Sequence, residues 1–383
     1  MVGHVTRLFT LLLLRIVQLG SAIAVLSAVH SLINLKLLRK PVSEKVINEK
    51  ISVLLPVLNE ADRIAPTLQS LLNQKMVPNL EIIIRDDGST DQTVSLIKHL
   101  IQNSPITVEL IVDDQSAPEG WVSKSWSCYQ MSKMAVGSVL VFTDADVKFA
   151  PTALAQSVAT LRDAELDLIS PYPKQVAISW SERLIQPLLQ WSWLSFLPLR
   201  IAEKSKNPNL VASNGQFIVV DATKYRVSGG HSAYPDAVLD DIALLRAIKN
   251  NSGRGNVIDG TNLATTRMYR NVTELTNGYT KSLWSVTNNR FQSRLISIFF
   301  LLGYVLPPLA ALSRLNPRIQ RAGAVGYLAA VLSRLLIARR TKSAEFPDVM
   351  THPISILGLV GLTELSWYRR VRKKLTWRGK KLP

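Results

Sequence analysis

The segment ISVLLPVLNE, residues 51–60, decides the fold class of this 383-residue chain. It opens with a mostly apolar run, Ile51–Leu55, that ends at Pro56 and is typical of a buried parallel strand, and its polar residues Asn59 and Glu60 follow. The same alternation continues, with expected strands at residues 81–85, 106–112 and 138–143 and expected helices at residues 60–73, 90–101 and 123–136. Strands that alternate with helices of this length form right-handed βαβ units. The sequence therefore predicts an α/β fold with a mainly parallel sheet flanked by helices.

Polar side chains follow three of these strands: Asn59 and Glu60 after the first, Asp86–Ser89 after the second, and Asp144-Ala145-Asp146 after the fourth. In parallel sheets ligands bind beyond the carboxyl ends of the strands. Each segment alone fits an ordinary turn or helix cap, but together they predict an acidic edge that binds a cationic or donor-rich ligand. Two carboxylates two residues apart suit a divalent metal that also binds phosphate oxygens. Within the second segment, Asp87 can accept a hydrogen bond from the imide N–H of a uracil ring.

The net charge of +17 lies at the two ends of the chain. Residues 51–290 have a net charge of −1, whereas residues 1–50 carry +5 and residues 291–383 carry +13. The near-neutral middle indicates a soluble domain, and the excess of basic residues in its flanks favours a membrane over nucleic acid as the partner.

Residues 16–35 contain no charged side chain, and a run of this length can cross a bilayer core about 30 Å thick. A cleaved signal peptide is the alternative, but the run is long for one and basic residues follow it. By the positive-inside rule, those basic residues place residues 51–290 on the cytoplasmic side.

Three further apolar runs follow the middle region, at residues 295–313, 322–338 and 349–368; the second is broken by Arg334 and the third by Glu364. Three full crossings would place the basic tail outside the cell, whereas the positive-inside rule places it inside. Pro307-Pro308 can break the first run into a re-entrant or interfacial hairpin. We expect a multi-pass protein of the cell membrane, and the number of crossings stays open.

Four motifs resemble the family 2 glycosyltransferases of the GT-A fold: ISVLLPVLNE at 51–60, IIIRDDGSTDQT at 82–93, VFTDADV at 141–147 and DDIALLRAIK at 240–249. The resemblance implies a nucleotide-diphosphate sugar as donor and Mn²⁺ or Mg²⁺ as cofactor. It implies that Asp87 contacts the nucleotide base, that Asp144 and Asp146 bind the metal, and that Asp241 is the catalytic base that deprotonates the acceptor. It also implies a transfer that inverts the anomeric carbon.

A narrower likeness points to the acceptor. Gly120-Trp121-x-x-Lys124, Gly229-Gly230-His231 and residues 259–284 are similar to bacterial membrane glycosyltransferases that modify carotenoids and hopanoids. This likeness implies a membrane lipid acceptor. It also implies the layout of an N-terminal membrane anchor and basic linker (1–50), a GT-A catalytic domain (51–290) and C-terminal transmembrane or interfacial helices with a basic tail (291–383).

The donor diphosphate carries charge that the protein must neutralise. Lys124, Arg267 and Arg270 are candidates for this role beside the metal ligands, since arginine pairs bidentately with phosphate oxygens. Surface charge is the alternative for all three. We count Asn59 and Glu60 with Asp87, Asp144 and these cations as the candidate donor-binding residues.

Other functions remain open at this stage. A processive polysaccharide synthase is disfavoured, because the Gln-x-x-Arg-Trp motif of such enzymes is replaced by Arg267-Met-Tyr-Arg270-Asn. A membrane scaffold that binds nucleotides without turnover is disfavoured by the intact Asp-x-Asp and Asp241. The aromatic residues of 178–199 fit either a packed helix or an interfacial one. Of the five histidines, His231 alone lies near a suspected acceptor loop.

Overall fold

The computed structural model describes residues 2–41, 45–113, 117–287, 289–377 and 380–381. The chain forms two compact units. We call residues 38–176, 199–268 and 378–383 the sheet unit, and residues 1–37, 177–198 and 269–377 the helical unit. The predicted boundaries at residues 50 and 290 stay a prediction.

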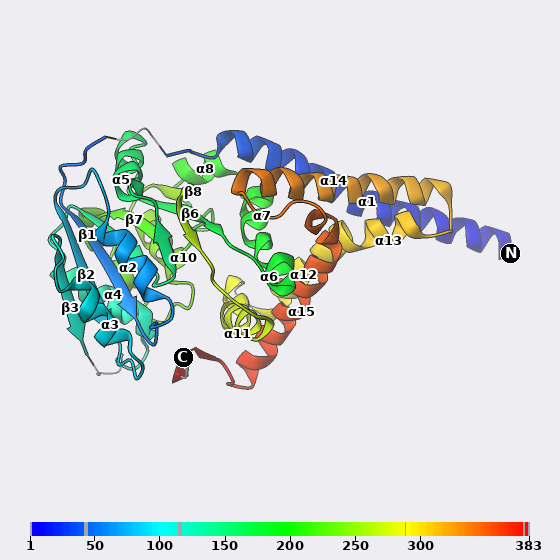
Figure 1. Ribbon diagram of the computed structural model, residues 1–383. Helices are drawn as coiled ribbons and strands as arrows, with labels where there is room; N and C mark the ends of the chain where they lie inside the picture. Colours follow the sequence, from blue (N-terminus) through cyan, green and yellow to red (C-terminus); the bar gives the residue numbers. More distant parts are fainter. Residues whose placement is uncertain (1, 42–44, 114–116, 288, 378–379, 382–383) are drawn as a thin grey trace. The chain divides into compact units, whose positions relative to one another are not determined.

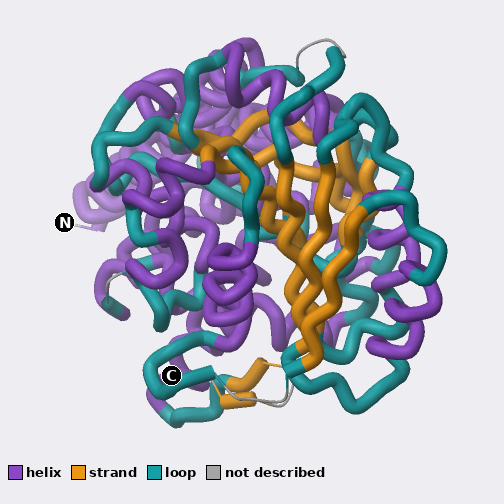
Figure 2. Tube along the Cα trace, turned by 90° about the vertical axis from the view of Figure 1, so that its left-hand side faces the viewer, coloured by secondary structure: helices purple, strands orange, loops and turns teal. Residues whose placement is uncertain are grey.

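The sheet unit is built on an eight-stranded sheet of order β3-β2-β1-β4-β7-β6-β8-β5 (Figures 1 and 2). The strands are β1 Ile51–Val57, β2 Leu80–Asp86, β3 Thr107–Val112, β4 Val139–Thr143, β5 Val147–Phe149, β6 Leu168–Gln175, β7 Phe217–Asp221 and β8 Gly255–Thr266. The β1–β2, β2–β3, β1–β4 and β6–β8 pairs are parallel, and β7 runs antiparallel to both β4 and β6. The predicted α/β class and the mainly parallel sheet are confirmed.

Helices cover both faces of this sheet. They are α2 Ile64–Leu72, α3 Thr93–Ile101, α4 Ser123–Met134, α5 Ala153–Asp163, α8 Leu199–Lys204, α9 Ala222–Val227, the 3₁₀ turn η1 Gly230–Ala233 and α10 Asp240–Asn250. Apolar residues of α2, α3 and α5 form one core with one face of the strands, and those of α4, α9 and α10 form a second core with the other face. Every residue of β4 is buried, as the continuous apolar runs of a two-sided sheet require.

Strand register brings the polar strand ends together. Ile51 of β1 pairs with Leu80 of β2 and with Val139 of β4, all in parallel. The segments after these strands therefore leave the same edge of the sheet, as predicted. The carboxyl ends of β1, β2 and β4 form the candidate active edge.

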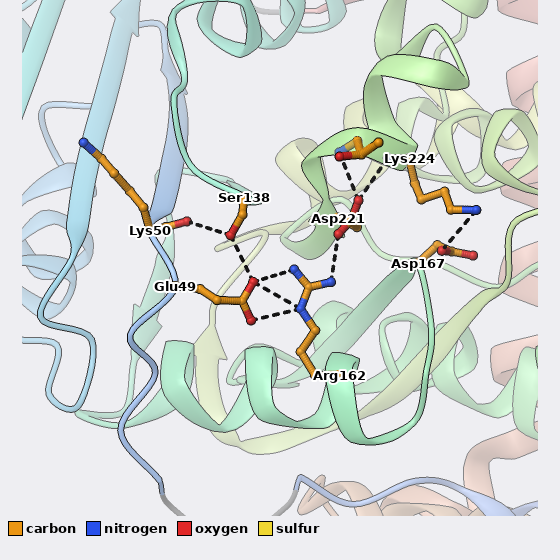
Figure 3. Close-up of polar contacts among 8 residues, drawn as sticks. Glu49, Lys50, Ser138, Arg162, Asp167, Asp221 and Lys224 are labelled. Atoms are coloured by element: carbon orange, nitrogen blue, oxygen red, sulfur yellow. Dashed lines mark hydrogen bonds and ion pairs between the residues drawn. The ribbon is translucent and has the colours of Figure 1, made fainter.

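A charged cluster closes the opposite edge (Figure 3). Arg162 of α5 donates to Glu49 before β1 at 2.6 Å and to Asp221 after β7 at 2.8 Å. Ser138 before β4 donates to the same Glu49 carboxylate at 2.9 Å. These contacts hold the start of β1, the start of β4 and the end of β7 together at the edge opposite the candidate active edge. The segment that precedes β1 is therefore packed onto the sheet through Glu49.

The helical unit contains the apolar runs. Its elements are α1 Val2–Leu37, α6 Trp180–Ile185, α7 Pro187–Phe196, α11 Val272–Ser282, the 3₁₀ turn η2 Leu283–Val286, α12 Arg290–Phe300, the π-helical turn η3 Leu301–Val305, α13 Leu306–Leu312, α14 Pro317–Thr341, the 3₁₀ turn η4 Asp348–Thr351 and α15 His352–Val371. Two short strands near the C-terminus are β9 Thr376–Trp377 and β10 Lys380–Lys381. Among the described residues, the helical segments long and apolar enough to cross a membrane are 7–37, 290–312, 317–341 and 348–371.

Small side chains allow α1 and α14 to lie side by side (Figure 1). Ser21 donates to the Ala322 carbonyl at 2.7 Å, and the hydroxyls of Ser31 and Ser333 are 3.0 Å apart. A Cβ added to Gly326 would lie 2.6 Å from the Ser21 hydroxyl, so this close approach requires glycine. Small residues at helix contacts are typical of membrane helix packing.

The aromatic segment of residues 178–199 lies almost entirely in the helical unit, and it contains both buried and exposed aromatic side chains. Trp191 is fully buried, and its ring contacts Tyr304 and His352 with centroids 5.0 and 4.7 Å away. Trp180 is 69% exposed. The packed interpretation therefore holds for Trp191, while the interfacial one stays a prediction for Trp180.

Candidate active site

Hydrogen bonds join the loops that follow β1 and β2. The Asn59 amide N–H donates to the Ser89 hydroxyl at 2.8 Å, and the Asn59 side-chain oxygen accepts from the Thr90 N–H at 2.9 Å. The backbone of Asn59 has a left-handed φ of 53°, which asparagine tolerates better than most residues. Asn59 therefore shapes the edge, and direct contact with the donor stays a prediction.

The two aspartates after β2 differ in their contacts. Asp86 is buried and accepts from the Ser89 N–H at 2.8 Å and the Gly88 N–H at 3.1 Å, so it holds the turn. Asp87 accepts from the Ser127 hydroxyl of α4 and lies 3.5 Å from Arg85 Nε. These contacts fix the Asp87 carboxylate at the active edge, where the sequence places the base-binding residue.

Lys124 links two acidic segments that are far apart in the sequence. Its ammonium lies 2.7 Å from Asp144 Oδ1, after β4, and 3.3 Å from Asp240 Oδ2, at the start of α10. Burial opposes the charged form of Lys124, but the attraction of Asp144 and Asp240 outweighs burial and raises its pKa well above the ordinary value. Lys124 is therefore a fixed cation within the acidic edge.

Asp146 has an unsatisfied oxygen. Its Oδ1 is buried and has no hydrogen-bond partner, and its Oδ2 lies 4.0 Å from Arg63 Nη1. Burial, followed by repulsion from Asp144 and Glu60, raises the pKa of Asp146 to about 7. A buried carboxylate oxygen without a partner is costly, and a bound cation would remove that cost.

These residues fit a divalent metal that the donor helps to bind. Asp144 and Asp146 supply hard oxygen ligands, and one of those oxygens has no other partner. Within the described ranges, no group of three or more His, Cys, Asp and Glu side chains could hold a metal ion. The remaining ligands would therefore come from the diphosphate oxygens and water.

Asp241 lies in the first turn of α10 and is 8% exposed. Burial, followed by repulsion from Asp240, raises its pKa to about 7. A carboxylate with a pKa near neutrality is suited to accept a proton and release it again. At the start of α10, the candidate base Asp241 thus follows Asp240, the residue that pairs with Lys124.

Sequence reasoning missed the turn of residues 214–216 before β7. The Gln216 carbonyl accepts from the Thr143 hydroxyl at 2.9 Å and from the Asp144 N–H at 3.4 Å. A Cβ added to Gly215 would lie 3.2 Å from Lys124 Nζ and 3.6 Å from Asp241 Cβ. The turn therefore covers Lys124 and Asp241. Its sequence pattern, a glycine between two amide residues ahead of an apolar run, is too common in proteins to identify such a turn from the sequence.

We expect Gly215→Val to lower kcat by up to about 100-fold with little change in melting temperature, because a branched side chain would displace the Lys124 ammonium by a fraction of an ångström or more. Release of nucleoside diphosphate and a thermal melt measure the two effects. Gly361→Val is the control: a Cβ there meets nothing within 4 Å. If Gly215→Val keeps full activity, the turn does not cover the reacting groups.

Sequence reasoning also missed Arg63 and left His231 open. Arg63 donates to the Met268 carbonyl at 3.2 Å beside Asp146. His231 is buried, bonds the Tyr225 hydroxyl through Nδ1 at 2.9 Å and packs on the Phe142 ring. Burial lowers the pKa of His231 to about 4, so the ring is neutral at pH 7. Its contacts are those of a packed core residue.

The two candidate arginines belong to different units. Arg267 follows directly after β8, whose last residue, Thr266, pairs with Val147, the residue after Asp146. This register places the Arg267 backbone beside the Asp-x-Asp segment. Arg270 is exposed in the helical unit, where its N–H donates to Glu274 at 3.1 Å, and its role at the donor stays a prediction.

The sequence and the fold are similar to those of known proteins. Residues 52–223 match the model of the family described as Glycosyl transferase family 2. The chain is 27% identical to the 4,4'-diaponeurosporenoate glycosyltransferase of Staphylococcus haemolyticus over 240 residues, which is 61% of each chain. It is 23% identical to the protein of the same name from Staphylococcus aureus strain MRSA252 over 352 residues, which is 89% of this chain and 91% of the relative.

Among solved structures, the chain is similar to the mannosyltransferase PcManGT from Pyrobaculum calidifontis in complex with GDP-Man and Mn²⁺. The TM-score is 0.54 at 18% identity, over 92% of this chain and 99% of the other. At this identity the likeness concerns the fold, and it agrees with the GT-A architecture of the sheet unit. Residues 52–223 therefore match glycosyl transferase family 2, and the fold of the chain is similar to that of a GT-A glycosyltransferase.

Proposed function

We propose that the chain transfers a sugar from a nucleotide-diphosphate sugar to a membrane lipid, with Mn²⁺ or Mg²⁺ and with inversion of the anomeric carbon. The observation that carries this proposal is the position of Lys124. Its ammonium contacts the Asp-x-Asp segment at Asp144 and the start of α10 at Asp240, so the donor-phosphate residues and the candidate base lie in one cluster.

The donor would lie along the carboxyl ends of β1, β2 and β4. Asp87, fixed by Ser127, would accept from the base, and Lys124 would bind a diphosphate oxygen. When bound at Asp144 and Asp146, the metal would neutralise charge on the leaving diphosphate. Asp144 would then share its oxygens between Lys124 and the metal, and the raised pKa of Asp146 would fall toward the ordinary range.

The acceptor would approach Asp241. If the acceptor group is a hydroxyl, the Asp241 carboxylate would take its proton as the oxygen attacks the anomeric carbon and the diphosphate leaves from the opposite side; a carboxylate acceptor, already ionised, would attack without a base. A positioned base of this kind contributes about 10²- to 10⁴-fold in rate. A single displacement of this geometry inverts the anomeric carbon.

The acceptor class rests on two supports. The helical unit contains apolar segments long enough to cross a membrane, which favours an acceptor that is itself in the membrane. Relatives at 23% and 27% identity carry a name that states 4,4'-diaponeurosporenoate as the substrate, and we extend this to a carotenoid or hopanoid type of lipid. The sheet unit would face the cytoplasm, where nucleotide sugars are made.

The test uses the purified full chain in lipid nanodiscs with a panel of nucleotide sugars. We expect release of nucleoside diphosphate that requires Mn²⁺ or Mg²⁺, stops with a chelator and accelerates when a carotenoid or hopanoid acceptor is added. A chain that binds sugar nucleotides without turnover under any of these conditions would refute the proposal. Growth of a polymer on the product would favour the processive synthase instead.

A further inference from the structure

The helix α15 begins inside the helical unit. His352, its first residue, is fully buried, with its ring 5.2 Å from the Tyr304 ring and its Nδ1 3.3 Å from Arg334 Nη1. Tyr304 lies 14 residues after Arg290 where α12 starts, which corresponds to about 21 Å of helix. The start of α15 is therefore deep in the bundle rather than at either end.

The segment that leads to α15 runs back along α14. Its contacts in chain order are Ser343 N with the Ala338 carbonyl at 3.0 Å, Glu345 with Arg339 at 3.0 Å, and the Met350 carbonyl with the Tyr327 hydroxyl at 3.1 Å. From Glu345 to Met350 the segment advances along the chain, while its partners on α14 change from Arg339 to Tyr327, which is about 18 Å closer to the start of α14. Non-helical backbone at membrane depth is tolerated where protein covers it. Here Asp348 and Val349 are buried and Asp348 is paired with Arg183 at 2.7 Å, while the apolar side chains of Phe346 and Met350 are 60% and 51% exposed.

The other end of α15 returns to the level at which α12 starts. Glu364 accepts from Arg290 at 2.9 Å and from Arg294 at 3.4 Å. One turn later, Arg369 donates to Asn277 and Thr280 of α11, which precedes α12 in the chain. The helix α15 therefore runs antiparallel to α12 and leaves the bundle at the end where α12 enters it.

The helix α1 also ends at this level of the bundle. The helix α1 runs parallel to α14, and its contacts with α13 and η3 are antiparallel: Val17 packs near Ala310, and Ser27 accepts from the Tyr304 hydroxyl at 2.6 Å. The last residue of α1, Leu37, thus lies toward the start of α12, and the sheet unit begins at residue 38. Leu37 and the basic residues 372–374 therefore lie at the same end of the bundle.

Exposed basic and aromatic side chains gather at this end. We call Arg290, Arg294, Arg372, Lys373 and Lys374 the headgroup rim; the side chains of Arg290 and Arg294 are 44% and 56% exposed, and residues 372–374 are exposed. Aromatic rings lie among them: the Arg370 guanidinium lies 3.4 Å from the Trp284 ring centroid, and the Arg372 guanidinium lies 5.7 Å from that of Tyr368. Basic and aromatic residues at one level are typical of the membrane interface.

We propose that α15 is a re-entrant helix that does not complete a crossing, and that the headgroup rim binds the phosphates of anionic phospholipids at the end of the bundle where α12 begins. The membrane crossings are then α1, the α12–α13 helix and α14. The basic tail lies inside together with the sheet unit, which removes the conflict between the count of apolar runs and the positive-inside rule. Each rim cation near an anionic surface strengthens binding by about fivefold.

Sidedness is tested with single cysteines and a membrane-impermeant maleimide. Cys128, the one native cysteine, is 1% exposed and is replaced by alanine. We expect Lys373→Cys to react from the same side as Lys206→Cys in the sheet unit, and Leu315→Cys, between α13 and α14, to react from the other side. If Lys373→Cys reacts from the side of Leu315→Cys, α15 crosses the membrane and the proposal is wrong.

Lipid binding is tested on the full chain in detergent, by the rise in melting temperature as phosphatidylglycerol or phosphatidylcholine is added. We expect stabilisation by phosphatidylglycerol alone, and at least a tenfold higher half-effective concentration for the Arg372→Glu, Lys373→Glu, Lys374→Glu variant. The control variant Lys75→Glu, Lys98→Glu, Lys206→Glu removes the same charge from exposed positions of the sheet unit and should behave as the wild type. Equal responses to both lipids, or equal losses in the two variants, would overturn the assignment of the rim.

Discussion

Replacing Asp241 by asparagine lowers kcat by about 10²- to 10⁴-fold and leaves the fold and donor binding in place, because the amide keeps the shape of the carboxylate but cannot take a proton. The residue is 8% exposed in the first turn of α10, and the neutral side chain also removes repulsion with Asp240. Steady-state kinetics, donor affinity by calorimetry and a thermal melt separate the three effects. Asp163→Asn, which changes an exposed carboxylate paired with Lys45, is the control and keeps full activity.

The pH profile of the wild type gives the same assignment a second check. The pKa of Asp241 is raised to about 7, and the base acts in its ionised form, so kcat should rise with pH through about 7 and then level off. In Asp241→Asn this ascending limb should disappear. A loss of kcat of less than tenfold in Asp241→Asn would contradict the role of Asp241 as base. A carboxylate acceptor, which is already ionised when it binds, would produce that result.

Replacing Asp146 by asparagine is expected to abolish metal-dependent transfer while the metal-free protein becomes more stable at neutral pH. The buried Oδ1 has no partner, so the ionised carboxylate destabilises the free protein and is needed only when a cation is bound. Because its pKa in the folded protein, about 7, lies above the ordinary 3.8, the wild type loses stability as pH rises from about 4 to 7.

Denaturant unfolding of the two proteins at pH 4.5 and 8, with a chelator present, measures this effect. The asparagine variant should show a smaller loss of stability between the two pH values than the wild type. Added Mn²⁺ together with nucleoside diphosphate should stabilise the wild type alone. An Asp146→Asn variant that is less stable at pH 8, or that still transfers sugar with Mn²⁺, would show that Asp146 has a structural role.

Local sequence patterns predicted the first half of the sheet unit. The runs Ile51–Leu55, Glu81–Arg85 and Ser138–Thr143 are mostly apolar, since both faces of these strands are covered, and the parallel pairing brings the carboxylates at their ends to one edge. The strands, and the acidic edge that they form, are where the sequence placed them.

Other features depend on contacts between distant segments. The antiparallel β7 lies between β4 and β6 because Val141 pairs with Val219 across nearly eighty residues, and no local pattern shows that pairing. The contact of Lys124 with both Asp144 and Asp240 likewise arises only when three elements meet. In the helical unit, hydropathy identified the apolar runs but not their direction, since the return of α15 depends on Glu364 pairing with Arg290.

The central claim, sugar transfer to a membrane lipid by the cluster around Lys124, is tested most directly by mass spectrometry of lipid extracts. Cells that express the wild type are compared with cells that express Asp241→Asn at equal protein levels. The account predicts a lipid in the wild-type extract that is heavier by one glycosyl unit than a lipid that accumulates in the variant. Identical lipid profiles, with a soluble or polymeric glycan made by the wild type alone, would contradict it.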